Sequence, residues 1–157
     1  MKLKIKCTGE HKPTRGSTSA AGIDLYNNDA HVAWLPQLVY IEEDNAVHHF
    51  DADYKIRIDT KTHVEIPEGY VGLVFPRSGL GSKGLRLANS TGVIDSDYRG
   101  PIIVVLEFNG ERPFKLCKGE RFAQLVIVPH YVYEMEFVDE LSDTERGEDG
   151  FGSTGTK

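Results

Sequence analysis

Hydrophobic and polar residues alternate with a period of two through most of this chain. The alternating segments are rich in Val, Ile, Tyr and Phe, and turn residues at 67–69, 109–110 and 118–120 separate several of them. Such a pattern predicts strands with one buried face. The predicted strands are Lys2–Cys7, Ala21–Tyr26, Tyr54–Asp59, His63–Ile66, Tyr70–Phe75, Ile102–Phe108, Phe122–Val128 and Tyr131–Val138. Many short strands with regular turns indicate an all-β sandwich or barrel.

Three stretches depart from this rhythm. A short helix is predicted near Ser82–Leu87, where the period of two is lost. Residues 27–53 are acidic and irregular, with room for a short extra strand or hairpin around Leu38–Ile41. From residue 142 onward the chain is polar and then Gly-rich, so this tail is expected to be disordered when alone.

Composition narrows the function classes. A chain of 157 residues with 39% hydrophobic residues is one globular domain, and no apolar run approaches membrane-spanning length. The net charge of −6 argues against nucleic-acid binding by bulk electrostatics. Cys7 and Cys117 are far apart and lack metal-type spacing, which favours reduced thiols and a cytoplasmic location. The six His are scattered, so a structural zinc site is not expected.

The segment Asn89–Gly100, NSTGVIDSDYRG, carries the richest chemistry in the chain. It places an amide, two carboxylates, a phenol and a guanidinium between flexible glycines. Such a loop can bend tightly and present its backbone to a flat ligand. The alternative is an ordinary polar hairpin, although a bare turn needs no Ile-Asp and Tyr-Arg pairs.

A second candidate, Pro76–Leu85, follows a predicted strand and combines Arg77 and Ser78 with glycines. Backbone N–H groups in a Gly-rich turn bind phosphate, and a guanidinium matches phosphate oxygens. A solvated turn with a surface arginine explains the same residues equally well.

Two predicted strands carry isolated polar residues. In Arg121–Ile127, Arg121 or Gln124 could reach a phosphate, although a core strand with one polar residue is the simpler interpretation. Asp24, between Ile23 and Leu25, would usually face water. It could instead hold a metal-bound water or orient an arginine.

The tail Arg146–Gly155, RGEDGFGSTG, is richer than a linker requires. Phe151 lies between two glycines and is suited to stacking on a base, while Ser153, Thr154 and Arg146 could hold an oxyanion. The alternative is a disordered tail without a ligand.

Together these segments resemble the five motifs of the trimeric deoxyuridine triphosphatase (dUTPase) family, in the same order. The motifs are AGIDLY at 21–26, PRSGLGSKGL at 76–85, NSTGVIDSDYRG at 89–100, RFAQLVI at 121–127 and RGEDGFGSTG at 146–155. The resemblance implies a β-jelly-roll homotrimer whose three active sites lie at subunit interfaces. It implies Mg²⁺-dependent hydrolysis of dUTP to dUMP and pyrophosphate, which keeps uracil out of DNA and supplies dUMP.

The resemblance also assigns roles within the nucleoside pocket. Asp95 is expected to be the general base for a water that attacks the α-phosphorus in line, and Tyr98 to pack on the deoxyribose. The uracil edge is expected to be read by Asn89 and by the hairpin backbone at Val93, Ile94, Asp95 and Ile103.

The remaining roles concern the phosphates. The expected phosphate-binding residues are Arg77, Ser78, Gly79, Gln124, Arg146, Ser153 and Thr154, with Phe151 and Gly152 closing over the base. Asp24 is expected to lie behind the metal or the catalytic residues. Mg²⁺ would be held by the triphosphate and water, without a direct protein ligand.

The family pattern implies a barrel domain over 1–141 and a flexible arm over 142–157 that closes the site. Two departures stand out. Asp149 adds negative charge where the family often has glycine, which would weaken closure of the tail. Residues 27–53 contain an insertion that is interpreted as a non-catalytic surface loop anchored by Trp34 and Tyr40. It could be structural padding, an extra trimer contact or a docking surface for another protein. If the gene is viral, the location would be the host cytoplasm.

Two rival functions remain open. A deoxycytidine triphosphate deaminase would need a Glu near the base pocket, and Asn89–Gly100 has none. A regulatory nucleotide sensor is favoured only by the acidic insertion.

Overall fold

The computed structural model describes residues 2–35, 38–43, 46–51, 54–110 and 113–148. Its single described helix, α1, is one turn long and spans Ser78–Gly81. The strands are β1 (Lys4–Cys7), β2 (Gly22–Tyr26), β3 (His31–Trp34), β4 (Leu38–Glu43), β5 (Ala46–Asp51), β6 (Ile56–Asp59), β7 (Thr62–Glu65), β8 (Tyr70–Pro76), β9 (Leu85–Leu87), β10 (Gly92–Ile94), β11 (Ile103–Phe108), β12 (Phe114–Leu116) and β13 (Arg121–Pro129). None of the described helices is long and apolar enough to cross a membrane.

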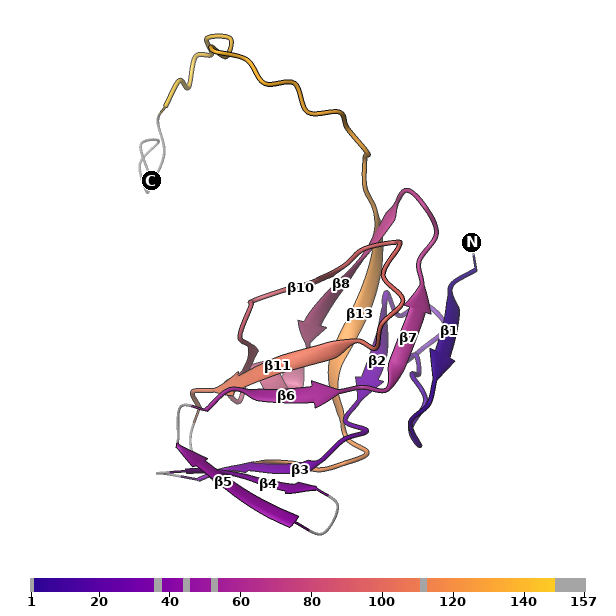
Figure 1. Cartoon of the computed structure of the whole chain (residues 1–157), viewed down its shortest axis with the longest axis vertical. Coiled ribbons are helices and arrows are strands. Elements are labelled where there is room, and N and C mark those ends of the chain that lie inside the picture. The colour runs from indigo at the N-terminus through magenta and orange to yellow at the C-terminus, as the bar shows by residue number, and fades with distance from the viewer. Residues whose placement is uncertain (1, 36–37, 44–45, 52–53, 111–112, 149–157) are drawn as a thin grey trace.

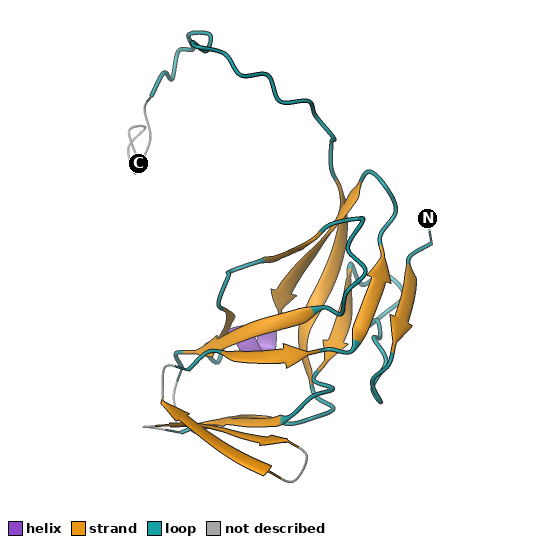
Figure 2. Cartoon of the chain, viewed as in Figure 1, coloured by secondary structure: helices purple, strands orange, loops and turns teal. Residues whose placement is uncertain are grey.

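Every described strand pairing is antiparallel, and the strands form small sheets that wrap around one core (Figures 1 and 2). The orders are β1-β7, β10-β8-β13-β2, β6-β11-β9 and β12-β3-β4-β5. Apart from the run β3-β4-β5, neighbours in these sheets are distant in the sequence, as in jelly rolls, where closure of the sheets protects strand edges. The predicted all-β, jelly-roll-like architecture is confirmed.

Alternation of burial explains why these segments are strands. In β11, Val104, Leu106 and Phe108 are buried while the residues between them are exposed or half-buried. Among the described residues, the largest fully buried side chain is that of Trp34, whose ring lies 5.8 Å from that of Phe108 and 5.7 Å from that of Phe114. The strands therefore fold by burying one apolar face each.

The predicted strand or hairpin around Leu38–Ile41 is confirmed, because β4 spans Leu38–Glu43 and pairs with both of its neighbours in the sequence. The prediction that the rest of 27–53 is irregular is wrong for the residues that the structure describes. β3, β4 and β5 form an antiparallel meander, and β12 extends it at the other edge. Trp34 and Val39 are fully buried within it, and the Tyr40 hydroxyl donates to Glu42 at 2.8 Å. This region is thus part of the core, because its apolar residues alternate beneath an acidic surface.

The predicted helix at Ser82–Leu87 is also wrong. The helix lies earlier, at Ser78–Gly81, and Leu85–Leu87 instead pairs with β11 as β9. Gly84 between them has a φ of +99°, which breaks the helix and turns the chain into the sheet.

The predicted strand at Tyr131–Val138 is not formed. The segment is extended but makes no described ladder, and Tyr131 and Phe137 are each 93% exposed. A strand needs a hydrogen-bonding neighbour, and the segment leaves the body of the molecule beyond β13 (Figure 1).

Trp34→Ala should lower the free energy of unfolding by about 3–5 kcal/mol, because it leaves a large cavity against Phe108 and Phe114. Urea unfolding at fixed protein concentration measures this. Val47→Ala on the same sheet, where Val47 is 49% exposed, is the matched control and should change stability by less than about 0.5 kcal/mol. Equal losses of stability in the two variants would contradict the contribution of the buried Trp34 to the core.

Candidate functional site

A small cavity lies beside the hairpin that contains Asp95. β10 pairs with β8, with Val93 opposite Leu73 and Ile94 opposite Gly72. The chain then turns at Asp95 and returns through Pro101 into β11. The cavity of about 240 Å³ is lined by Arg57, Val93, Ile94, Asp95, Tyr98, Pro101 and Ile103. Five of the residues predicted to bind the nucleoside are therefore brought together.

Local hydrogen bonds fix the Tyr98 ring in this cavity. The Tyr98 N–H donates to the Asp95 carbonyl at 3.2 Å, and the Tyr98 hydroxyl donates to the Pro101 carbonyl at 2.9 Å. The ring lies against Gly100, where a Cβ would collide with the phenol. Glycine is therefore required at 100 for the ring to take this position, which explains why Tyr-Arg-Gly occurs as a unit.

Arg57 on β6 was not predicted as a site residue. It lies opposite Val105 of β11 and lines the same cavity as Asp95 and Tyr98. In the sequence it is one polar position of an alternating strand, and such positions usually face solvent. Only the pairing of β6 with β11 brings it to the hairpin.

Asn89 lies near this hairpin but does not line the cavity. Its side chain is exposed, and its carbonyl accepts the Thr91 N–H at 2.7 Å. Its predicted role at the uracil edge therefore remains a prediction.

A second polar cluster is built around Asp24 on β2. Its carboxylate contacts Arg77 Nε at 2.9 Å through Oδ1 and Arg121 Nη1 at 3.1 Å through Oδ2. Asp24 is only 9% exposed, whereas the two arginines are more accessible. Of the alternatives left open by the sequence, the geometry shows that Asp24 orients arginines.

Backbone contacts position the rest of this cluster. The Arg77 N–H donates to the Phe122 carbonyl at 3.1 Å, which ties the end of β8 to β13. Gln124 pairs with Asp24 in the sheet and donates through Nε2 to the Pro76 carbonyl at 3.2 Å. Ser78 and Gly79 are exposed at the start of α1. Arg77, Ser78, Gly79 and Gln124 thus lie close together, as predicted, with Arg121 beside them.

β8 holds the two clusters apart within one chain. The hairpin cavity lies beyond Gly72 at one end, and Arg77 follows Pro76 at the other. At roughly 3.3 Å per residue, Gly72 and Pro76 alone are separated by ~13 Å. Asp95 and Arg77 lie beyond these two ends, so one chain does not bring its own general base candidate to its own phosphate-binding candidates.

The tail carries the remaining candidates. Arg146 is exposed and lies in a bend of the tail, where the Gly147 N–H donates to the Thr144 carbonyl at 3.1 Å. The tail as a whole runs away from the body of the molecule (Figure 1). The predictions for Phe151, Gly152, Ser153 and Thr154 fall outside the described residues.

No group of three or more His, Cys, Asp or Glu side chains within the described ranges is placed to hold a metal ion. Both oxygens of Asp24 are already engaged by guanidinium groups.

The sequence is similar to that of known proteins along nearly its whole length. Residues 9–155 match the family model described as dUTPase. The deoxyuridine 5′-triphosphate nucleotidohydrolase of Escherichia phage T5 is 52% identical over 159 aligned residues, covering 99% of each chain. The corresponding protein of Beijerinckia indica is 43% identical and covers 91% of this chain and 82% of its own length.

Solved structures agree with the sequence comparisons. A variant of the Staphylococcus bacteriophage 80alpha dUTPase with the nucleotide analogue dUpNHpp superposes with a TM-score of 0.73, 32% identity and 98% coverage of both chains. A variant of the Staphylococcus aureus phage phi11 dUTPase, described with a structural Mg(II) ion, gives 0.69 at 27% identity, covering 89% of this chain and 98% of that one. The family match therefore spans the fold, the hairpin and the arginine cluster alike, and this chain belongs to the dUTPase family.

Proposed function

We propose that this protein hydrolyses dUTP to dUMP and pyrophosphate at sites shared between three copies of the chain. The observation that carries the proposal is that the candidate base and the candidate phosphate-binding residues lie in two separate places on one chain. The cavity with Asp95 and the cluster with Arg77 are each chemically incomplete and lie at opposite ends of β8. Contact between copies would bring the hairpin of one chain to the arginines of another. The nucleotidohydrolase relatives and the dUpNHpp complex support dUTP as the substrate.

Asp95 acts as the general base. Its exposed carboxylate lines the cavity beside Tyr98, where it can take a proton from a water that attacks the α-phosphorus. A positioned base typically accelerates such a step about 10²–10⁴-fold. Fixing the water and the phosphorus in line adds to this effect because it removes orientational freedom before the reaction.

The hairpin provides selectivity for a uracil deoxynucleotide. Backbone groups at 93–95, together with Ile103 and Asn89, form hydrogen bonds with the edge of the base. At this edge uracil has a donor at N3 and an acceptor at position 4, whereas cytosine has an acceptor at N3 and a donor at position 4. A mismatched edge leaves buried polar groups unpaired at a cost of about 1–3 kcal/mol each. Tyr98, held by its bond to Pro101, packs on the deoxyribose and leaves no space for a 2′-hydroxyl. The thymine methyl is refused by the same narrow cavity.

The second cluster binds the triphosphate. Arg77, Ser78, Gly79 and Gln124 contact its oxygens, and Asp24 keeps the Arg77 guanidinium in a fixed orientation. Fixed cations and N–H groups stabilise charge that develops on the leaving pyrophosphate. Mg²⁺, held by phosphate oxygens and water, would supply further charge neutralisation.

The tail completes the site. Arg146, Ser153 and Thr154 bind the terminal phosphate, while Phe151 and Gly152 cover the uracil. Ordering of a polar tail over the bound nucleotide excludes bulk water. Residues 142–157 thus form an arm that follows a barrel domain over 1–141.

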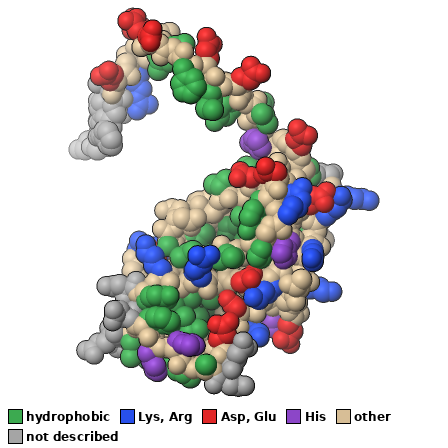
Figure 3. Space-filling model, viewed as in Figure 1, with side chains coloured by type: hydrophobic (Ala, Val, Ile, Leu, Met, Phe, Trp, Pro, Cys, Tyr) green, Lys and Arg blue, Asp and Glu red, His purple; other side chains and the backbone are tan. Residues whose placement is uncertain are grey.

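The segment just before the arm supports assembly into a trimer. Its apolar side chains recur at alternate positions and are 76–93% exposed, at Tyr131, Tyr133, Met135 and Phe137. Figure 3 shows apolar and acidic side chains interspersed along the extended tail. Such a face requires a cover, and β1 offers one because its only described partner is β7 and it carries Lys4 and Lys6. We propose that the segment adds to β1 of a neighbouring copy.

Asp95→Asn should reduce dUTP turnover at least about 10²-fold while leaving nucleotide affinity nearly unchanged, since an amide cannot accept the proton. Pyrophosphate release gives the turnover, and titration with a non-hydrolysable dUTP analogue gives the affinity. Near-normal turnover in this variant would show that Asp95 is not the base.

Tyr98→Ala should narrow the preference for dUTP over UTP by roughly tenfold or more, because the ring no longer excludes the 2′-hydroxyl. The ratio of kcat/KM for the two nucleotides measures this, with dCTP and dTTP as further substrates. Tyr98→Phe keeps the ring and is the matched control, expected to retain most of the preference. An unchanged ratio in Tyr98→Ala would remove Tyr98 from sugar selection.

Two truncations should separate assembly from closure. Ending the chain at Glu145 should preserve the trimer and lower turnover by about 10² or more, because the closing arm is gone. Ending it at Pro129 should also abolish the trimer, because the apolar segment is removed. Sedimentation velocity and pyrophosphate release report the two properties. A trimer that survives removal of everything after Pro129 would contradict the proposed role of this segment.

A further inference from the structure

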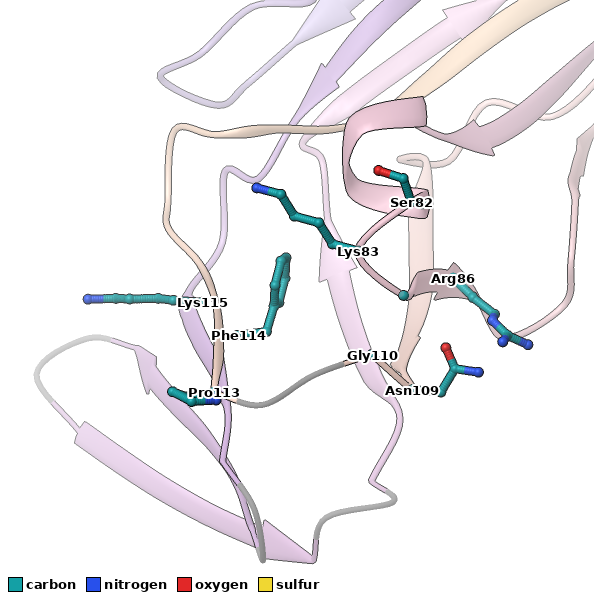
Figure 4. A pocket seen from close by; sticks show the side chains of 10 residues that line it. Ser82, Lys83, Arg86, Asn109, Gly110, Pro113, Phe114 and Lys115 are labelled. Carbon is teal, nitrogen blue, oxygen red and sulfur yellow. The ribbon is translucent and has the colours of Figure 1, made fainter.

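The structure contains a second polar cavity that the proposed reaction does not use. It has a volume of about 970 Å³ and lies between the turn that follows α1, strand β9 and the start of β12. Figure 4 shows Lys83, Arg86 and Lys115 on these three elements, with the Phe114 ring between Lys83 and Lys115 and with the charged ends of the three side chains pointing in different directions. The hairpin cavity with Asp95 shares no lining residue with it.

The three cations have no described partner. Lys83, Arg86 and Lys115 are exposed and form no ion pair or side-chain hydrogen bond within the described ranges. No Asp or Glu is among the described residues that line the cavity. In a chain of net charge −6, this is a local concentration of positive charge within a concave surface. Such a surface focuses its field and attracts anions.

The floor of the cavity is fixed by two glycines. Gly84, with a φ of +99°, crosses Gly110 so closely that a Cβ on either residue would collide with the other segment's backbone. The Asn109 N–H donates to the Gly84 carbonyl at 3.1 Å and joins the two turns. The crossing therefore holds the turn that carries Lys83 against the end of β11.

We propose that this cavity is a binding site for an extended polyphosphate anion. Three separated cations match several phosphate groups better than one, and the volume is within the range of small-molecule sites. Lysine and arginine are the side chains that bind phosphate oxygens, through charge-assisted hydrogen bonds. The anion is either free inorganic polyphosphate or the polyphosphate chain of a nucleotide whose base contacts Phe114.

The site is separate from the proposed catalytic one but is connected to it through α1. Arg77 precedes this helix and Ser78 is its first residue. At the other end of the helix, Gly81 and Ser82 line the cavity. The proposal itself does not depend on the proposed function, because binding is measured without turnover.

The test uses inorganic tripolyphosphate, without Mg²⁺, added to the full-length protein carrying Arg77→Gln. This background weakens binding at the proposed catalytic cluster. Calorimetry gives the affinity, and amide ¹H–¹⁵N spectra report the location through Gly84 and Gly110 in the cavity and Gly79 outside it. The variant is Lys83→Gln with Lys115→Gln, and the matched control is Lys12→Gln with Lys118→Gln, which removes the same charge from exposed positions away from the cavity.

The expected result is binding that shifts Gly84 and Gly110 and weakens about 100-fold in the cavity variant, or roughly tenfold per cation. The control should retain the affinity. A parallel titration with ATP identifies the source of the anion. If ATP binds more tightly than tripolyphosphate, its base also contacts the cavity, and the anion is the polyphosphate chain of a nucleotide. Shifts confined to Gly79, absence of binding, or equal weakening in the control would overturn the proposal.

Discussion

Strand β8 imposes the constraint on which the rest of this molecule depends. It pairs with β10 on one side and β13 on the other, so it fixes both the hairpin that carries Asp95 and the junction that carries Arg77. Because a strand is stiff, the two groups cannot approach each other within one chain. Under the proposed function, the nucleotide therefore meets the base and the cations on different copies. In this account, assembly is a requirement of the chemistry as well as a source of stability.

The placement of charged groups also prepares the chain to bind an anion. The chain is acidic overall, yet Asp24 is nearly buried between Arg77 and Arg121 and orients both. A largely buried carboxylate that lost these partners would be strongly destabilising, and the arginines would lose their fixed directions. A preorganised guanidinium stabilises developing charge better than a mobile one. The acidic surface elsewhere, including the tail, does not prevent anion binding at this cluster, because salt largely screens exposed charges that are more than about 10 Å apart.

Most of the fold could be predicted because alternating hydrophobicity is a local signal. β8 and β13 occur where Tyr70–Phe75 and Phe122–Val128 were expected, and the family motifs placed Asp95 with Tyr98 and Arg77 with Gln124. Contacts between residues that only strand pairing brings together could not be predicted from this local signal. Arg57 reaches the hairpin only because β6 pairs with β11.

Two wrong predictions have a related cause. The alternation of Tyr131–Val138 is real, but a strand also needs a partner, and this chain provides none in the described structure. The helix was expected after Ser82, yet the positive φ of Gly84 ends it early and redirects the chain into β9. Backbone conformation and the presence of a neighbour are tertiary properties that residue pattern alone does not contain.

Mixing two inactive variants tests the shared site most directly. Asp95→Asn lacks the base and Arg77→Gln lacks a phosphate ligand, so each alone should be nearly inactive. When the two chains are refolded together, about one site in four should combine an intact hairpin with an intact arginine cluster and hydrolyse dUTP. Recovery of activity only in the mixture is the predicted result. Mixed assemblies that form but remain inactive would contradict the account.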